Sequence, residues 1–135
     1  MKFLGFGAII YVENMKNKIE VLWDRDDLKN TSLVGYIECT QCDLESVFGV
    51  PASEIDEEWP SDGKTQNEWW VRINGTVVII YDYKEDRHYL DEETMMFHVA
   101  GESIQALFEL MVVGFDAAQV LTREEFYNKR FGNFA

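Results

Sequence analysis

The sequence predicts an α+β fold: a mainly antiparallel sheet with a central Asn-Gly hairpin and two to three short helices. Two observations favour this class. Runs rich in β-branched and aromatic residues recur along the chain, and helix-capping motifs mark short helices between and after them. The 135 residues contain no repeat, low-complexity tract or Gly/Ser linker, so we expect one compact domain over residues 1–135.

The first third of the chain contains three strand-like runs. Phe3–Val12 is apolar and β-branched enough for a buried strand, and the absence of a small-residue cleavage site after it disfavours a signal peptide. Lys18–Trp23 fits a second, short strand, and the charged run Asp24–Asn30 fits a turn or a short helical turn. Leu33–Cys39 is the clearest strand of this region.

A capped helix follows that strand. The hydroxyl of Thr40 can accept a hydrogen bond from the exposed backbone N–H of Asp43, and an acidic residue suits a helix N-terminus. We therefore expect a helix over Gln41–Phe48 that stops at Gly49, with Pro51 preventing its continuation.

The strongest local signal is a hairpin. Glu68–Ile73 and Thr76–Tyr83 are aromatic and β-branched runs separated by Asn74-Gly75. Asn-Gly is the preferred pair for a two-residue type I′ turn, because both positions need positive φ. Met95–Val99 fits a further short strand.

Two helices are expected near the C-terminus. Ser103 can cap a helix over Ile104–Val113, and a capping box at residues 122–125 opens a last helix that ends near Gly132. The apolar face of the first of these is expected to consist of Ile104, Leu107, Phe108 and Met111.

Charge is the strongest global signal. Twenty-five Asp and Glu face twelve Lys and Arg, which gives a formal net charge of −13. Such a surface repels phosphates and anionic lipids, so the sequence predicts no direct nucleic-acid partner and no membrane partner. A basic surface of a protein is the expected partner, and the alternative is that the charge serves solubility alone. No basic residue occurs in residues 30–63, and a second acidic cluster spans residues 82–93.

The candidate binding residues come from these two clusters and from the hairpin. Adjacent residues on a strand face opposite sides of a sheet, so one of Trp69 and Trp70 is expected in the core. The other could anchor a partner beside Arg72 and Tyr81 or Tyr83; alternatively, both faces are covered. The acidic candidates are Glu54, Asp56, Glu57, Glu58, Asp62, Glu85 and Asp86.

Signals for catalysis or metal binding are weak, and we expect no cofactor, no metal and no catalytic residue. Cys39 and Cys42 form a single Cys-x-x-Cys, interpreted as structural thiols, with a redox pair or a zinc site as alternatives. His88 and His98 lack the spacing of a zinc pair, and the acidic run before Gly63 does not fit an EF-hand. His98 lies close to an acid and a serine in sequence, which leaves a small enzyme or ligand-binding protein as an alternative.

Several short runs within residues 33–112 resemble a family of small bacteriophage and viral accessory proteins that has no assigned activity. The resemblance implies a virus-encoded protein, located in the host cytoplasm, which acts on a host process. We therefore expect a non-enzymatic, acidic binding protein that inhibits or occupies a host defence or nucleic-acid-binding protein; the other alternative is a virion structural or assembly component. The resembling runs are Val47-Phe48-Gly49-Val50-Pro51, Lys64-Thr65, Glu68-Trp69, Gly75-Thr76-Val77, Ile80-Tyr81-Asp82-Tyr83-Lys84, Phe97-His98-Val99-Ala100-Gly101 and Ala106-Leu107.

Overall fold

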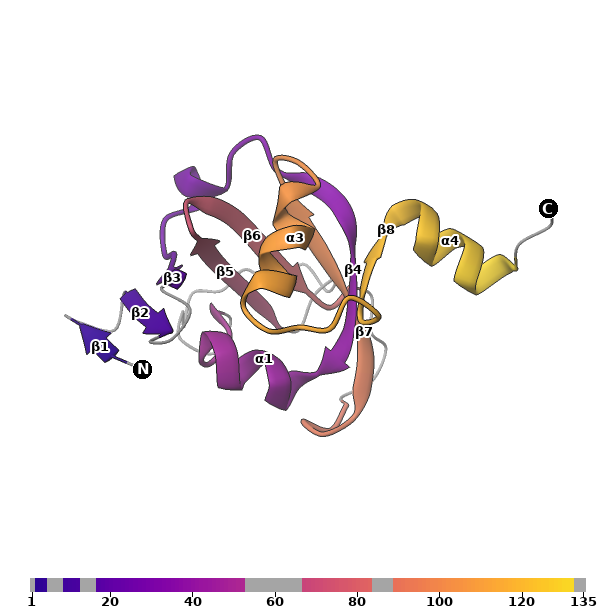
Figure 1. Cartoon of the computed structure of the whole chain (residues 1–135), viewed down its shortest axis with the longest axis horizontal. Coiled ribbons are helices and arrows are strands. Elements are labelled where there is room, and N and C mark those ends of the chain that lie inside the picture. The colour runs from indigo at the N-terminus through magenta and orange to yellow at the C-terminus, as the bar shows by residue number, and fades with distance from the viewer. Residues whose placement is uncertain (1, 5–8, 13–16, 53–66, 84–88, 133–135) are drawn as a thin grey trace.

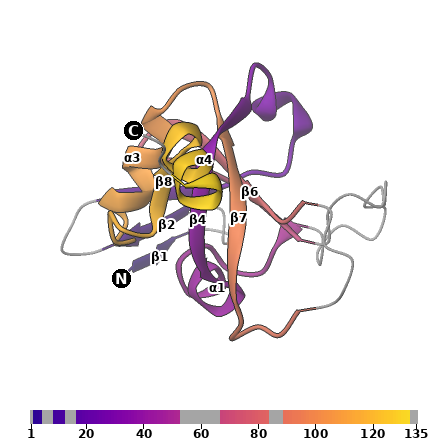
Figure 2. The same cartoon turned by 90° about the vertical axis from the view of Figure 1, so that its right-hand side faces the viewer.

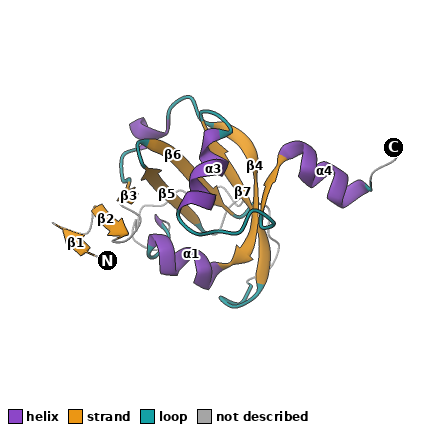
Figure 3. Ribbon diagram, in the orientation of Figure 1, coloured by secondary structure: helices purple, strands orange, loops and turns teal. Residues whose placement is uncertain are grey.

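One antiparallel sheet dominates the fold. The structure, a computed structural model, describes residues 2–4, 9–12, 17–52, 67–83 and 89–132. Eight strands pair in the order β1-β2-β3-β5-β6-β7-β4-β8 (Figure 1, Figure 3). The prediction of an α+β fold with an antiparallel sheet is confirmed. The elements in chain order are β1 (Lys2–Leu4), β2 (Ile9–Val12), β3 (Asn17–Val21), the 3-10 helix η2 (Arg25–Leu28), β4 (Ser32–Thr40), α1 (Gln41–Phe48), β5 (Glu68–Ile73), β6 (Thr76–Tyr81), β7 (Thr94–Gly101), α3 (Gln105–Val112), β8 (Val120–Thr122) and α4 (Arg123–Phe131).

The two strongest local signals of the sequence form as expected. Helix α1 begins after a complete capping box: the Thr40 hydroxyl accepts the Asp43 amide at 3.0 Å, and the Asp43 carboxylate accepts the Thr40 amide at 3.1 Å. In the hairpin of β5 and β6, Asn74 and Gly75 have φ values of 50° and 88°. Positive φ at both central positions is the type I′ geometry that an Asn-Gly pair favours.

Helices α1 and α3 cover one face of the sheet, which we call the inner face (Figure 1). The close approach of α3 depends on small residues, because a Cβ atom at Gly101 of β7 would lie 2.6 Å from Cβ of Ala106. The buried side chains of this core include Ile37, Leu44, Phe48, Trp69, Ile80, Phe97, Val99, Leu107 and Leu110.

The face of α3 that packs on the sheet differs from the prediction. Ala106, Leu107 and Leu110 are buried, whereas Ile104 and Phe108 are 49% and 47% exposed. Of the four predicted residues, Leu107 is buried and Met111 packs against the core, so the buried face is rotated toward Ala106 and Leu110. The helix itself begins at Gln105, whose backbone N–H donates a hydrogen bond to the Ser103 hydroxyl at 3.2 Å.

The opposite, outer face of the sheet is only partly covered. Leu22, Trp70 and Ile79 form a second, smaller buried cluster, against which Leu28 at the end of η2 packs. Arg72 lies on the same face as Trp70 and forms ion pairs with Glu20 and Asp27 at 3.2 and 3.4 Å. On the same face, the side chains of Tyr81 in β6, His98 in β7 and Tyr36 in β4 are only partly buried.

A polar cluster attaches the hairpin turn to two other elements. Oδ1 of Asn74 accepts a hydrogen bond from the backbone N–H of Lys18 in β3 at 3.0 Å. Nδ2 of Asn74 donates to Asn17 at 3.0 Å and to Glu109 of α3 at 3.3 Å. Gln105 also donates to Glu109, at 3.3 Å. The turn is therefore held by its side chain as well as by its backbone.

Two parts of the fold depart from the sequence prediction. The region 3–12 contains two paired strands, β1 and β2, in place of one. Strand β8, which pairs with β4, was not expected. It leads into α4, whose capping box at Thr122 forms as predicted. This helix extends away from the sheet in Figure 1 and is seen nearly end-on in Figure 2. Within the described ranges, no helix has the length and apolar character needed to span a bilayer.

Candidate functional site

The acidic residues selected from the sequence lie outside the described residues. They are Glu54, Asp56, Glu57, Glu58 and Asp62 in the 53–66 segment, and Glu85 and Asp86 in the 84–88 segment. The residues that flank these two segments are described.

A buried hydrogen-bond network joins those flanking residues. Asp82 is 2% exposed, and both of its carboxylate oxygens accept a hydrogen bond from the backbone N–H of Asn67 at 3.2 Å. The Tyr89 hydroxyl donates to Asp82 at 2.6 Å and accepts from the Asn67 side chain at 2.8 Å. Asn67 follows the first segment, and Asp82 and Tyr89 lie on either side of the second. The described residue that follows the 53–66 segment and described residues on both sides of the 84–88 segment are therefore bonded to one another.

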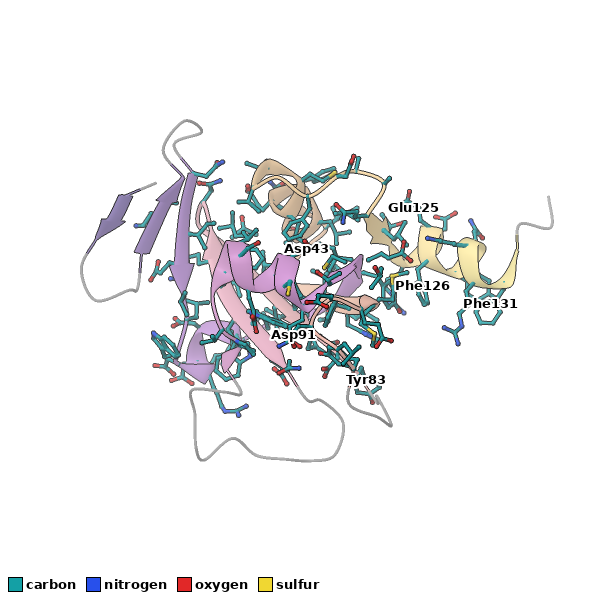
Figure 4. All side chains as sticks on the ribbon, turned by 90° about the horizontal axis from the view of Figure 1, so that it is seen from below. Asp43, Tyr83, Asp91, Glu125, Phe126 and Phe131 are labelled. Atoms are coloured by element: carbon teal, nitrogen blue, oxygen red, sulfur yellow. The ribbon has the colours of Figure 1, made fainter. Side chains whose placement is uncertain are left out.

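Described carboxylates gather close to this network. The network reaches the start of α1, since Asn67 donates to Gln41 at 3.4 Å. The backbone amide of the next residue, Cys42, donates to the carbonyl oxygen of Asp91 at 3.0 Å. Four acidic side chains act on the exposed Cys42 thiol, and Figure 4 shows two of them, Asp43 and Asp91, beside α1. We call the four the acidic cluster: Asp43, Glu45, Asp91 and Glu92.

The acidic cluster is open and negatively charged. Asp43, Asp91 and Glu92 are exposed, and no ion pair to any of the four acids occurs in the part of the chain that the structure describes. Leu90, beside Asp91, is 73% exposed and offers an apolar contact next to the charges. The sequence marked Asp91 and Glu92 as part of a charge cluster, but only the fold brings them next to α1.

Neither tryptophan of the hairpin is exposed, so neither is the exposed anchor that we expected, and the alternative in which both faces are covered holds. Trp69 lies in the inner core, 1% exposed, and its indole N–H donates to the Gly49 carbonyl at 2.9 Å. Trp70 lies on the outer face, 5% exposed, with its N–H donating to Glu68 at 2.9 Å and with Arg25 over its ring. The two do face opposite sides of the sheet, and both sides are covered there.

The two cysteines differ in environment. Burial, and to a lesser degree the Asp43 carboxylate, raises the pKa of the Cys39 thiol to about 12. The pKa of Cys42 is also raised, first by desolvation and then by the acidic cluster. A lowered pKa favours the reactive thiolate, and the surroundings of both thiols act in the opposite direction. Among the described residues, no group of three or more His, Cys, Asp or Glu is placed to hold a metal ion.

His98 lies in a row of rings on the outer face of the sheet. Tyr81 of β6, His98 of β7 and Tyr36 of β4 are direct cross-strand neighbours, with ring centroids 5.2 Å and 4.9 Å apart. Phe126 of α4 stacks on Tyr36 at 3.8 Å, and Tyr83 lies 5.5 Å from His98. We call these five residues the aromatic row. The sequence could not reveal it, because its members come from separate elements.

Burial lowers the pKa of His98, and the nearby Asp82 carboxylate opposes this effect. Nδ1 of His98 is buried and has no hydrogen-bond partner. In a catalytic histidine one ring nitrogen reacts and a hydrogen bond to the other orients the ring. No described residue supplies such a bond to Nδ1 of His98.

Comparison with protein-family models, with curated proteins and with solved structures found no significant match.

Proposed function

We propose that the protein is an acidic binding module that occupies the basic, nucleic-acid-binding surface of another protein. The observation that carries the proposal is the acidic cluster at the start of α1, whose four carboxylates have no ion-pair partner among the described residues. A net charge of −13 extends the same sign over the whole molecule. Complementary charge of this kind speeds encounter and disfavours wrong partners more than it adds affinity.

The hydrogen-bond network supports the same proposal. It brings together the described ends of two segments that carry seven acidic candidates, and it lies beside the acidic cluster. In the proposed complex these acids take the place of phosphates on the partner's basic surface. The resemblance to phage and viral accessory proteins makes a host defence or nucleic-acid-binding protein the partner that we propose.

The test uses a pair of charge reversals. Proteins retained by the full chain from host extract at low salt, and released at high salt, are identified by mass spectrometry. Association rates with the purified partner are then measured for wild type and for the Asp91→Lys/Glu92→Lys variant. The control, Glu102→Lys/Glu124→Lys, changes two exposed acids elsewhere by the same total charge.

We expect the Asp91→Lys/Glu92→Lys variant to associate about 10-fold more slowly at low salt, with a nearly unchanged dissociation rate. Added salt should reduce the difference, and nucleic acid should compete with the protein for the partner. Equal association rates for the two variants would show that the charge serves solubility and not recognition.

A further inference from the structure

The proposed role of the acidic cluster leaves the aromatic row unexplained. Its strand residues lie in the same register as Glu68, so that Glu68, Tyr81, His98 and Tyr36 are consecutive neighbours across four strands. The adjacent register on the same face, with Trp70, Ile79 and Ala100, is buried. The rings of the row are only partly buried, and Tyr83 is exposed. The row is thus an accessible strip next to a covered one.

The chain's own arginines show which chemistry this face accepts. Cζ of Arg25 lies 5.2 Å from the ring centre of Trp70, on the β5 side of the row. Cζ of Arg130 lies 6.0 Å from the ring centre of Phe126, at the α4 end. A guanidinium group is attracted to the negative face of an aromatic ring at such distances. Both sides of the strip therefore already hold an arginine against a ring.

Carboxylates border the row as well. Glu68 lies directly opposite Tyr81, and its charge adds to burial in raising the Tyr81 pKa. Glu38 lies two residues beyond Tyr36 and hence on the same face of β4, where it is paired with Lys129 at 3.4 Å. Rings flanked by acids are complementary to a cation, whereas a phosphate-bearing strand would meet repulsion from the net charge of −13.

We propose that the aromatic row binds an arginine side chain of the partner protein, with the guanidinium group on the rings of Tyr81 and Tyr83 and near the carboxylate of Glu68, which lies directly opposite Tyr81. This inference rests on the proposed function and adds an anchor to it. The acidic cluster sets the association rate of the partner, and the aromatic row lowers its dissociation rate. An arginine is preferred to a lysine because its planar group can stack on a ring and donate to a carboxylate at once.

The experiment uses the full chain and defined peptides. A labelled Gly/Ser-rich 12-residue peptide with two arginines is titrated into the protein. Two matched peptides carry citrulline, an uncharged isostere, or lysine. Affinity is read by fluorescence anisotropy, and the site by the NMR shift of the His98 ring protons. Tyr81→Leu and Tyr83→Ala alter the row, and Tyr127→Ala removes an exposed tyrosine on α4 outside it. Thermal unfolding checks that each variant is folded.

We expect the arginine peptide to bind about fivefold more tightly than the citrulline peptide and to shift the His98 signals. Tyr83→Ala, which changes an exposed residue, and Tyr81→Leu should each weaken binding about three- to fivefold, and Tyr127→Ala should not. Equal affinity of the arginine and citrulline peptides, or unchanged binding by both row variants, would overturn the proposal. So would a single-stranded oligonucleotide that shifts the His98 signals when the arginine peptide does not.

The two proposals fail separately. If Asp91→Lys/Glu92→Lys slows association with the partner while the row variants bind the arginine peptide as wild type does, the row proposal is wrong and the acidic module stands. If the row variants lose the peptide while the charge reversal leaves association unchanged, the row binds arginine but the proposed function is wrong.

Discussion

Removal of one hydroxyl group should test the buried network that joins the described ends of the two acidic segments. In Tyr89→Phe, the Asp82 carboxylate loses a donor at 2.6 Å and the Asn67 side chain loses an acceptor at 2.8 Å. A hydrogen bond to a charged group contributes about 1.5–3 kcal/mol and a neutral one about 0.5–1.5 kcal/mol. Because the ring itself stays in place, we expect the free energy of unfolding to fall by about 2–4 kcal/mol.

Urea denaturation measures this loss. With an m-value of about 2 kcal/mol/M, the midpoint should fall by about 1–2 M while m stays unchanged. Tyr127→Phe is the matched control: its side chain is exposed, so the change should stay within about 0.5 kcal/mol. If Tyr89→Phe also costs less than about 0.5 kcal/mol, the network does not stabilise the fold and the reasoning about the segment ends is wrong.

Three further outcomes follow from other sites. A thiol reagent should modify Cys42 alone in the native protein and Cys39 only after unfolding, so two reactive thiols per native chain would contradict the burial of Cys39. Gly35→Ala should cost about 1–3 kcal/mol in urea denaturation, since a Cβ there would clash with the Leu121 carbonyl oxygen; unchanged stability would refute the close approach. Because the His98 pKa is lowered from 6.5 in the folded state, the unfolded chain takes up its proton first, and stability is lost as the pH falls below about 6.5. His98→Gln should lose less stability than wild type between pH 7.5 and 5.5, and parallel profiles would argue against the lowered pKa.

The elements that the sequence predicted well are those fixed by local chemistry. Helix α1 has the predicted bounds because its capping box and its terminal glycine act within a few residues. The Asn74-Gly75 turn forms for the same reason. Strand β8 has only three residues and no pattern of its own, and it exists because it pairs with β4. Its detection requires knowledge of the tertiary fold.

The candidate site was predictable in its charge and not in its geometry. Composition indicated an acidic surface, but the proximity of Asp91 to α1 arises from a backbone hydrogen bond to Cys42. The expected tryptophan anchor failed because pattern alone shows which side of a strand a residue takes, not what covers that side. On the outer face Trp70 is covered together with Leu22 and Ala52. The partly exposed rings belong to the neighbouring row of cross-strand partners, which contains Tyr81 and His98.

The side-chain bonds of Asn74 limit how the hairpin can be redesigned. Glycine would keep the backbone turn but lose the donor to Glu109 and the acceptor for Lys18. Aspartate would keep the turn and the acceptor but place a second carboxylate beside Glu109. Asparagine is thus the residue that satisfies the turn, strand β3 and helix α3 together. An affinity tag or a grafted epitope inserted at this turn would loosen three elements, although hairpin turns are the usual first choice for such insertions.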